Sequence, residues 1–210
     1  MKRLWKSYFV FLSKGYKWLA LTIFPLMLLG LVLLLFGEDK DGTYVVARAV
    51  ILSYVAIFEL VSDYWLFGGL CNKTENGLVY LKSSVKGMEV LRNGIIGDLL
   101  RRFLYQMILG LILFSVTGNL FDILLVFILY AVEVATLNVL RHMVVWQFYL
   151  ILSAVAMLIY DVLFVLIWVA NDVLEASTWV LGLELAVAFV IDLLVSVGTV
   201  WYMLYCAKKN

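Results

Sequence analysis

Long apolar runs separated by short polar stretches dominate this chain. A transmembrane α-helix needs about 20 predominantly apolar residues. Runs of about that length cover residues 18–36, 44–66, 103–117 and 121–140. A further stretch, 143–205, has room for two more helices, with an acidic cluster around Asp172 and Glu175 between them. The pattern predicts an all-α polytopic membrane protein with six transmembrane helices in a single transmembrane domain, residues 1–210.

Composition supports a membrane location. Apolar residues make up 65% of the 210 positions, whereas soluble domains are closer to half apolar. The first apolar run has full spanning length and no small-residue cleavage site after it, so we expect a retained first helix. Cys71 and Cys206 are expected to be free thiols, and a single histidine, His142, does not indicate a metal site.

Basic residues can be gathered on one side of the membrane by this threading. Fourteen of the sixteen Lys and Arg residues then fall on one side, leaving Lys40 and Arg48. The fourteen are Lys2, Arg3, Lys6, Lys14, Lys17, Lys73, Lys82, Lys86, Arg92, Arg101, Arg102, Arg141, Lys208 and Lys209. The positive-inside rule then predicts a multi-pass protein of the inner or cytoplasmic membrane, with both termini and the 67–102 loop in the cytoplasm.

Two cytoplasmic segments are amphipathic. Residues 1–17 alternate aromatic and basic side chains at helical spacing, which predicts an interfacial helix on anionic lipid, or else a basic topology signal. Within the 67–102 loop, residues 78–102 place apolar side chains among Lys82, Lys86 and Arg92. This pattern predicts a helix lying across the cytoplasmic face.

The stretch 143–205 is longer than two helices require. It holds 63 residues, and two spans need about 40. Because the spare residues lie between Trp168 and Trp179, short helices that enter the outer leaflet and return are expected there. Two long tilted helices are the alternative.

Carboxylates within the apolar runs are the chemical candidates. They are Glu59, Asp63, Glu133, Asp161, Glu184 and Asp192. Ionisable groups at membrane depth usually face a bundle interior or a wet cavity. They could form a proton or cation path, line a path for a cationic substrate, or make interhelical hydrogen bonds. The runs offer these carboxylates almost no basic partner. No phosphate-binding loop or catalytic nucleophile motif is found, so catalytic residues are not expected.

The layout resembles the permease subunit of an ABC-2-type exporter. Residues 81–90, LKSSVKGMEV, resemble the loop that leads into span 3 of that family, with Val85, Lys86 and Glu89 fitting its pattern. The resemblance implies a separate ATP-binding subunit that carries ATP and magnesium, a homodimeric or paired permease, contact with membrane lipids, and no nucleic acid. It also implies export of an amphipathic peptide, lipid-like or hydrophobic substrate. The implied ATPase contacts are Lys82, Val85, Lys86, Met88, Glu89 and Arg92.

Three other functions fit the same pattern. One is the substrate-binding membrane subunit of an energy-coupling-factor uptake system, which has a similar size and helix number. Another is a proton-coupled carrier or channel that uses the intramembrane carboxylates. An intramembrane enzyme is the last, and for it no nucleophile or metal set is recognised.

Overall fold

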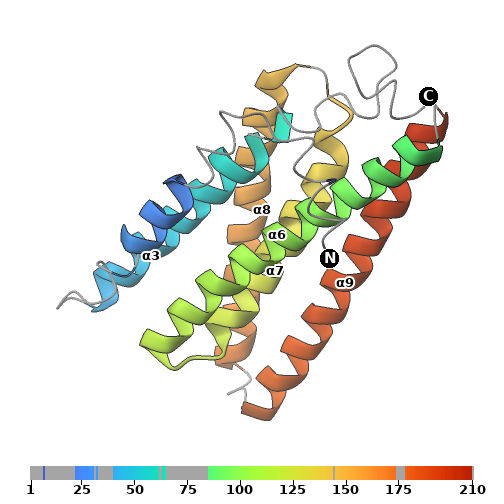
Figure 1. Ribbon diagram of the computed structural model, residues 1–210. Helices are drawn as coiled ribbons and strands as arrows, with labels where there is room; N and C mark the ends of the chain where they lie inside the picture. Colours follow the sequence, from blue (N-terminus) through green and yellow to red (C-terminus); the bar gives the residue numbers. More distant parts are fainter. Residues whose placement is uncertain are drawn as a thin grey trace.

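The computed structural model describes part of the chain, and that part is helical. Described are residue 7 and residues 22–30, 32, 40–61, 63–64, 85–143, 145–173 and 178–209. These residues contain no strand, and Figure 1 shows them as a bundle of long helices. The predicted all-α class is confirmed for them. The predicted interfacial helix, 1–17, lies outside the described residues apart from Ser7.

The bundle is built around helix α7. Helix α3 (Lys40–Tyr54) continues into the π-helix η1 (Val55–Val61). Helices α6 (Val85–Thr117), α7 (Phe121–Leu140), α8 (Trp146–Val173) and α9 (Thr178–Lys209) follow. Helix α7 contacts α6, α8, α9 and η1, so it is the central helix of the described part.

Three helices of the described part are long and apolar enough to cross a membrane. They are Phe121–Leu140, Trp146–Asn171 and Trp179–Cys206. The first matches the predicted run 121–140 residue for residue. Gly118 separates it from α6 with φ +68°, a left-handed conformation that glycine adopts without steric cost. The Asn119 side chain then accepts a hydrogen bond from the Phe121 amide, at 3.0 Å, where α7 begins.

The described residues between Trp168 and Trp179 do not form the predicted short re-entrant helices. Helix α8 continues to Val173 and α9 begins at Thr178; residues 174–177 lie outside the described part. The stretch from Trp168 to Trp179 contains neither glycine nor proline. The described residues on either side of 174–177 are helical, so the spare residues there extend two helices of 28 and 32 residues.

The predicted helix across the cytoplasmic face is not separate from the predicted span 103–117. Residues 67–84 lie outside the described part, but Val85–Thr117 is one helix of 33 residues. At 1.5 Å per residue it is about 50 Å long, which exceeds the ~30 Å hydrocarbon core. The amphipathic half is therefore collinear with the apolar half and does not form a separate helix across the face (Figure 1).

The packing of this amphipathic half explains why it continues in line with the apolar half. Its apolar stripe, Leu91, Ile95 and Leu99, is buried against Tyr130 and Val134 of α7 and against Met203 of α9. The apolar stripe of this part of α6 is therefore covered by protein, and lipid is not needed to cover it. By contrast, many large apolar side chains of α8 and α9 are exposed, as expected for helices in contact with lipid.

Candidate functional site

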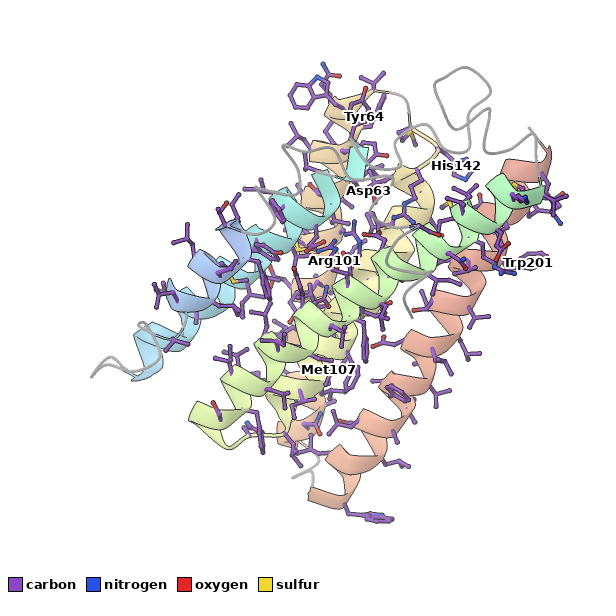
Figure 2. All side chains as sticks on the ribbon, viewed as in Figure 1. Asp63, Tyr64, Arg101, Met107, His142 and Trp201 are labelled. Carbon is purple, nitrogen blue, oxygen red and sulfur yellow. The ribbon has the colours of Figure 1, made fainter. Side chains whose placement is uncertain are left out.

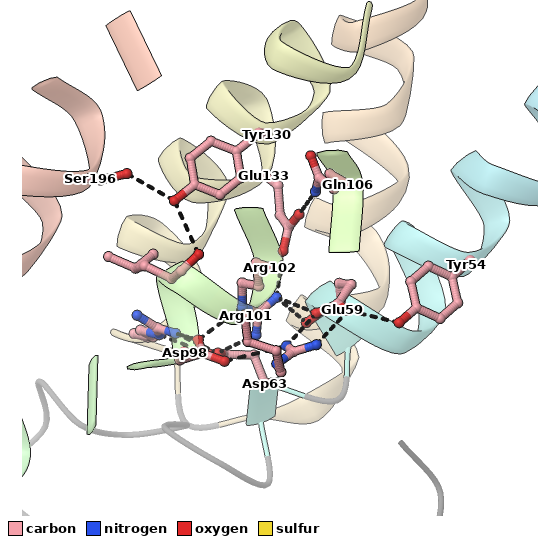
Figure 3. Close-up of polar contacts among 12 residues, drawn as sticks. Tyr54, Glu59, Asp63, Asp98, Arg101, Arg102, Gln106, Tyr130, Glu133 and Ser196 are labelled. Atoms are coloured by element: carbon pink, nitrogen blue, oxygen red, sulfur yellow. Dashed lines mark hydrogen bonds and ion pairs between the residues drawn. The ribbon is translucent and has the colours of Figure 1, made fainter. Parts of the chain in front are cut away.

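A buried network of arginine and carboxylate side chains joins three parts of the bundle (Figure 3). Its members are Arg101, Arg102 and Asp98 on α6, Glu59 and Asp63 in and just after η1, and Glu133 and Arg141 on and just after α7. All are at most 6% exposed. Figure 2 shows Arg101 near the middle of the bundle, below Asp63 in this view, with Met107 farther along α6.

Arg102 is the centre of the network. It is fully buried. Its Nη1 donates to the Glu59 carbonyl at 2.9 Å and to Glu133 Oε1 at 2.5 Å. Its Nη2 donates to Asp63 Oδ1 at 3.1 Å, and its Nε donates to Asp98 Oδ2 at 2.9 Å. One guanidinium therefore connects η1, α7 and its own helix.

The other two guanidiniums make bidentate contacts. Arg101 donates to both oxygens of Glu59, at 2.8 and 2.6 Å. Arg141 donates to both oxygens of Asp63, at 3.0 and 2.7 Å, and to Asp98 at 2.9 Å. Bidentate arginine–carboxylate pairs combine charge with a matched planar geometry. They hold the three chain segments in one relative position.

Local structure explains how these side chains meet. Asp98, Arg102 and Gln106 are four residues apart along α6, so they share one helical face. The i→i+5 hydrogen bonding of a π-helix places Tyr54 one turn before Glu59, and the Tyr54 hydroxyl donates to Glu59 Oε1 at 2.9 Å. Gln106 Nε2 donates to Glu133 Oε2 in a short contact.

The charges of the network nearly balance. Four carboxylates, Glu59, Asp63, Asp98 and Glu133, surround three guanidiniums. Asp98 lies before the apolar half of α6. Burial opposes its ionisation most strongly, but Arg102, Arg101 and Arg141 together outweigh burial and hold the pKa of Asp98 below its usual range. The described residues contain no group of three His, Cys, Asp or Glu that could hold a metal ion.

This network corrects the prediction that the intramembrane carboxylates have almost no basic partner. Glu59, Asp63 and Glu133 each contact an arginine. The sequence interpretation missed this because Arg101, Arg102 and Arg141 were counted as cytoplasmic loop charges. Asp98 was not predicted at all. The spacing of four residues from Asp98 to Arg102 to Gln106 within an amphipathic helix was a usable signal.

The remaining three carboxylates have different surroundings. Glu184 on α9 accepts a hydrogen bond from Asn171 Nδ2 of α8, at 3.2 Å. Asp161 on α8 is half-buried. Asp192 on α9 is only 2% exposed, and neither of its carboxyl oxygens has a hydrogen-bond partner among the described residues. The structure does not bring these three residues into the arginine network.

The predicted ATPase contacts lie at the beginning of α6, except Lys82, which is outside the described residues. Val85 is 89% exposed, and Lys86, Glu89 and Arg92 are exposed as well. Met88 is half-buried and packs on the cluster that contains Leu91. Four of the predicted contact residues are therefore accessible at one end of the helix. Met88 is partly buried by packing within the chain.

Comparisons of the chain with known protein families, curated protein sequences and solved structures gave no match. The arguments for function therefore depend on the residues and geometry described above. Two features stand out in that geometry: an exposed, charged helix end on α6 and the buried ionic network about two turns further along the same helix.

Proposed function

We propose that the chain is the membrane-spanning subunit of an ATP-driven exporter of the ABC-2 type. It crosses the inner or cytoplasmic membrane six times with both termini in the cytoplasm, and it pairs with a second permease copy or a related chain. The ATPase is a separate chain. The observation that carries the proposal is the construction of α6, whose exposed charged end is rigidly connected to the buried network.

Helix α6 has the properties of a lever between a cytoplasmic partner and the bundle. From Glu89 to Arg102 the helix rises about 20 Å. At the far end of this distance Arg102 contacts Asp63 and Glu133, which lie beyond η1 and on α7. A continuous helix does not bend easily. Movement of its exposed end therefore also moves Arg102 and the residues that Arg102 contacts. An ATPase that moves residues 85–92 would thereby move the membrane helices.

The position of the network is consistent with the proposed topology. Asp63 lies near the end of the apolar run 44–66, Arg102 just before 103–117, and Arg141 just after 121–140. The three are joined by direct ion pairs through Asp63. These three run ends are the ones that positive-inside counting assigns to the cytoplasm. The proposed substrate class, an amphipathic peptide, lipid-like or hydrophobic molecule, follows from the resemblance.

Charge reversal on α6 tests this proposal. Lys86→Glu combined with Arg92→Glu should abolish co-purification of a soluble ATPase from native membranes in mild detergent. Lys208→Glu, an exposed reversal at the end of α9, is the matched control and should retain the ATPase. If the wild-type chain purifies without an ATPase, even after crosslinking in intact membranes, the proposal is wrong. Equal recovery of the ATPase with the double variant would reject the contact at α6.

A proton-coupled carrier is the second candidate, and Asp192 favours it. Asp192 is a buried carboxylate on a membrane-length helix and has no hydrogen-bond partner among the described residues. Ionisable groups at this depth often mark ion and proton pathways. Transport by such a carrier would stop when a protonophore collapses the proton gradient and would continue after ATP depletion. An exporter with a partner ATPase shows the opposite dependence.

A further inference from the structure

An apolar cavity lies between α6 and α9. Its volume is about 610 Å³, within the 300–1,000 Å³ that small-molecule sites usually have. Its walls are side chains of α6, α9 and α7, among them Leu99, Phe103, Tyr130, Phe189 and Trp201. Among the described residues that line it, Asp192 is the single carboxylate.

Asp192 is the one polar residue of its helical stripe that the described protein leaves unsatisfied. Asp192, Ser196 and Thr199 follow each other at spacings of four and three, so they share the inward face of α9. The Ser196 hydroxyl is 2.9 Å from the Tyr130 hydroxyl, and Thr199 accepts from Asn138 Nδ2 at 2.9 Å. Both partners are on α7. Neither oxygen of Asp192 has such a partner among the described residues, although the residue is 2% exposed.

Helix α9 has no basic residue near Asp192. It lies 13 residues after Trp179 and 14 before Cys206, the ends of the apolar part of α9. At 1.5 Å per residue, each end is about 20 Å away. Between Thr178 and Ala207 the helix contains no lysine, arginine or histidine. The described residues that line the cavity include no lysine, arginine or histidine, so among them nothing supplies the cation that an ionised carboxylate in apolar surroundings needs.

We propose that this cavity binds a lipophilic cation, a positively charged centre carried by an aliphatic or aromatic body. The charged centre would lie against the Asp192 carboxylate, and the body would contact the apolar walls. Phe103, Phe189 and Trp201 add aromatic faces, which attract cations through their ring quadrupoles. A lipid acyl chain could fill the same volume, but it offers nothing to the carboxylate. The inference concerns this cavity alone and does not rest on an ATPase at α6.

Two probes of equal shape and opposite charge test the site. The full chain, purified in lipid nanodiscs, would be titrated with tetraphenylphosphonium and with tetraphenylborate. We expect saturable binding of one phosphonium per chain and binding of the borate at least tenfold weaker. Asp192→Asn should weaken phosphonium binding at least tenfold and remove the preference for the cation. Asp192→Glu, which keeps the charge, should retain the preference.

The matched control is Glu184→Gln on the same helix. Glu184 already has a partner, Asn171 Nδ2, and it is not part of the cavity lining, so this variant should bind the phosphonium as the wild type does. Equal binding of the two probes by the wild-type chain would overturn the proposal, and this result does not depend on whether any variant folds. So would absence of saturable phosphonium binding, or unchanged binding by Asp192→Asn.

Discussion

Replacing Arg102 by methionine is the most direct perturbation of the buried network. Methionine keeps an unbranched side chain of similar length but removes the guanidinium. In the native structure that group contacts Glu59, Asp63, Asp98 and Glu133 and has no exposed surface. The variant leaves four carboxylates facing two guanidiniums. Glu133 loses the arginine it contacts among the described residues and keeps the short contact from Gln106.

The expected loss of stability follows from these contacts. Removing one partner from a buried ion pair costs about 3–5 kcal/mol, because the other charge remains buried without compensation. Individual charge-assisted hydrogen bonds are worth ~1.5–3 kcal/mol. Adding them over all contacts of Arg102 would overestimate the effect, since Arg101 and Arg141 still bind Glu59, Asp63 and Asp98. We therefore expect a decrease of about 3–5 kcal/mol in the free energy of unfolding at neutral pH.

Denaturant unfolding in detergent, followed by tryptophan fluorescence, measures this loss. Arg92→Met is the control, because Arg92 is exposed on the same helix; it should change stability by less than ~0.5 kcal/mol. Adding Glu133→Gln to Arg102→Met should recover part of the loss, because it removes the carboxylate left without a guanidinium. If Arg102→Met and Arg92→Met both lose little unfolding free energy, the network does not stabilise the bundle as argued. The same conclusion follows if the double variant loses as much stability as Arg102→Met and Glu133→Gln do separately, added together.

Two further predictions concern neighbouring contacts. Because the pKa of Asp98 lies below its usual range, its contribution to stability is complete above about pH 4 and falls as the pH drops through that lowered pKa. Asp98→Asn should therefore be destabilised at pH 7 and lose less on acidification than the wild type in pH-dependent unfolding. A Cβ at Gly110 would lie 3.1 Å from Val126 of α7, so Gly110→Val should cost about 1–3 kcal/mol in thermal unfolding. Gly198→Val, with open space around it among the described residues, should cost no more than about 1 kcal/mol.

Several elements of the fold could be predicted from local pattern. The run 121–140 became α7 with the same bounds, because its length, its apolar composition and the Gly118–Asn119 turn are all local signals. The re-entrant segment was predicted from a surplus of residues, which does not reveal whether a helix breaks or lengthens. In the described residues the two helices lengthen, with α8 continuing to Val173 and α9 beginning at Thr178.

The candidate sites were less predictable. Residue type and depth identified Glu59, Asp63, Glu133 and Asp192 as candidates. Their different situations, with Glu59, Asp63 and Glu133 paired to arginines and Asp192 without a hydrogen-bond partner, follow from which helices pack together. The positive-inside count assigned Arg101, Arg102 and Arg141 to loops. Reading the sequence alone, it treats every charge at the end of an apolar run as a loop charge.

By itself, the sequence determined the helical class, the apolar segments and the residues that carry charge at their ends, because segment length and hydrophobicity are properties of neighbouring residues. The tertiary structure alone decided that the amphipathic part of α6 packs on α7 and α9, and that this packing brings Asp98 and Arg102 to partners 31 to 43 residues away in the chain. Charges so far apart in sequence meet only when burial of apolar side chains fixes the helices against one another. The same packing leaves Asp192 in a cavity without a hydrogen-bond partner among the described residues.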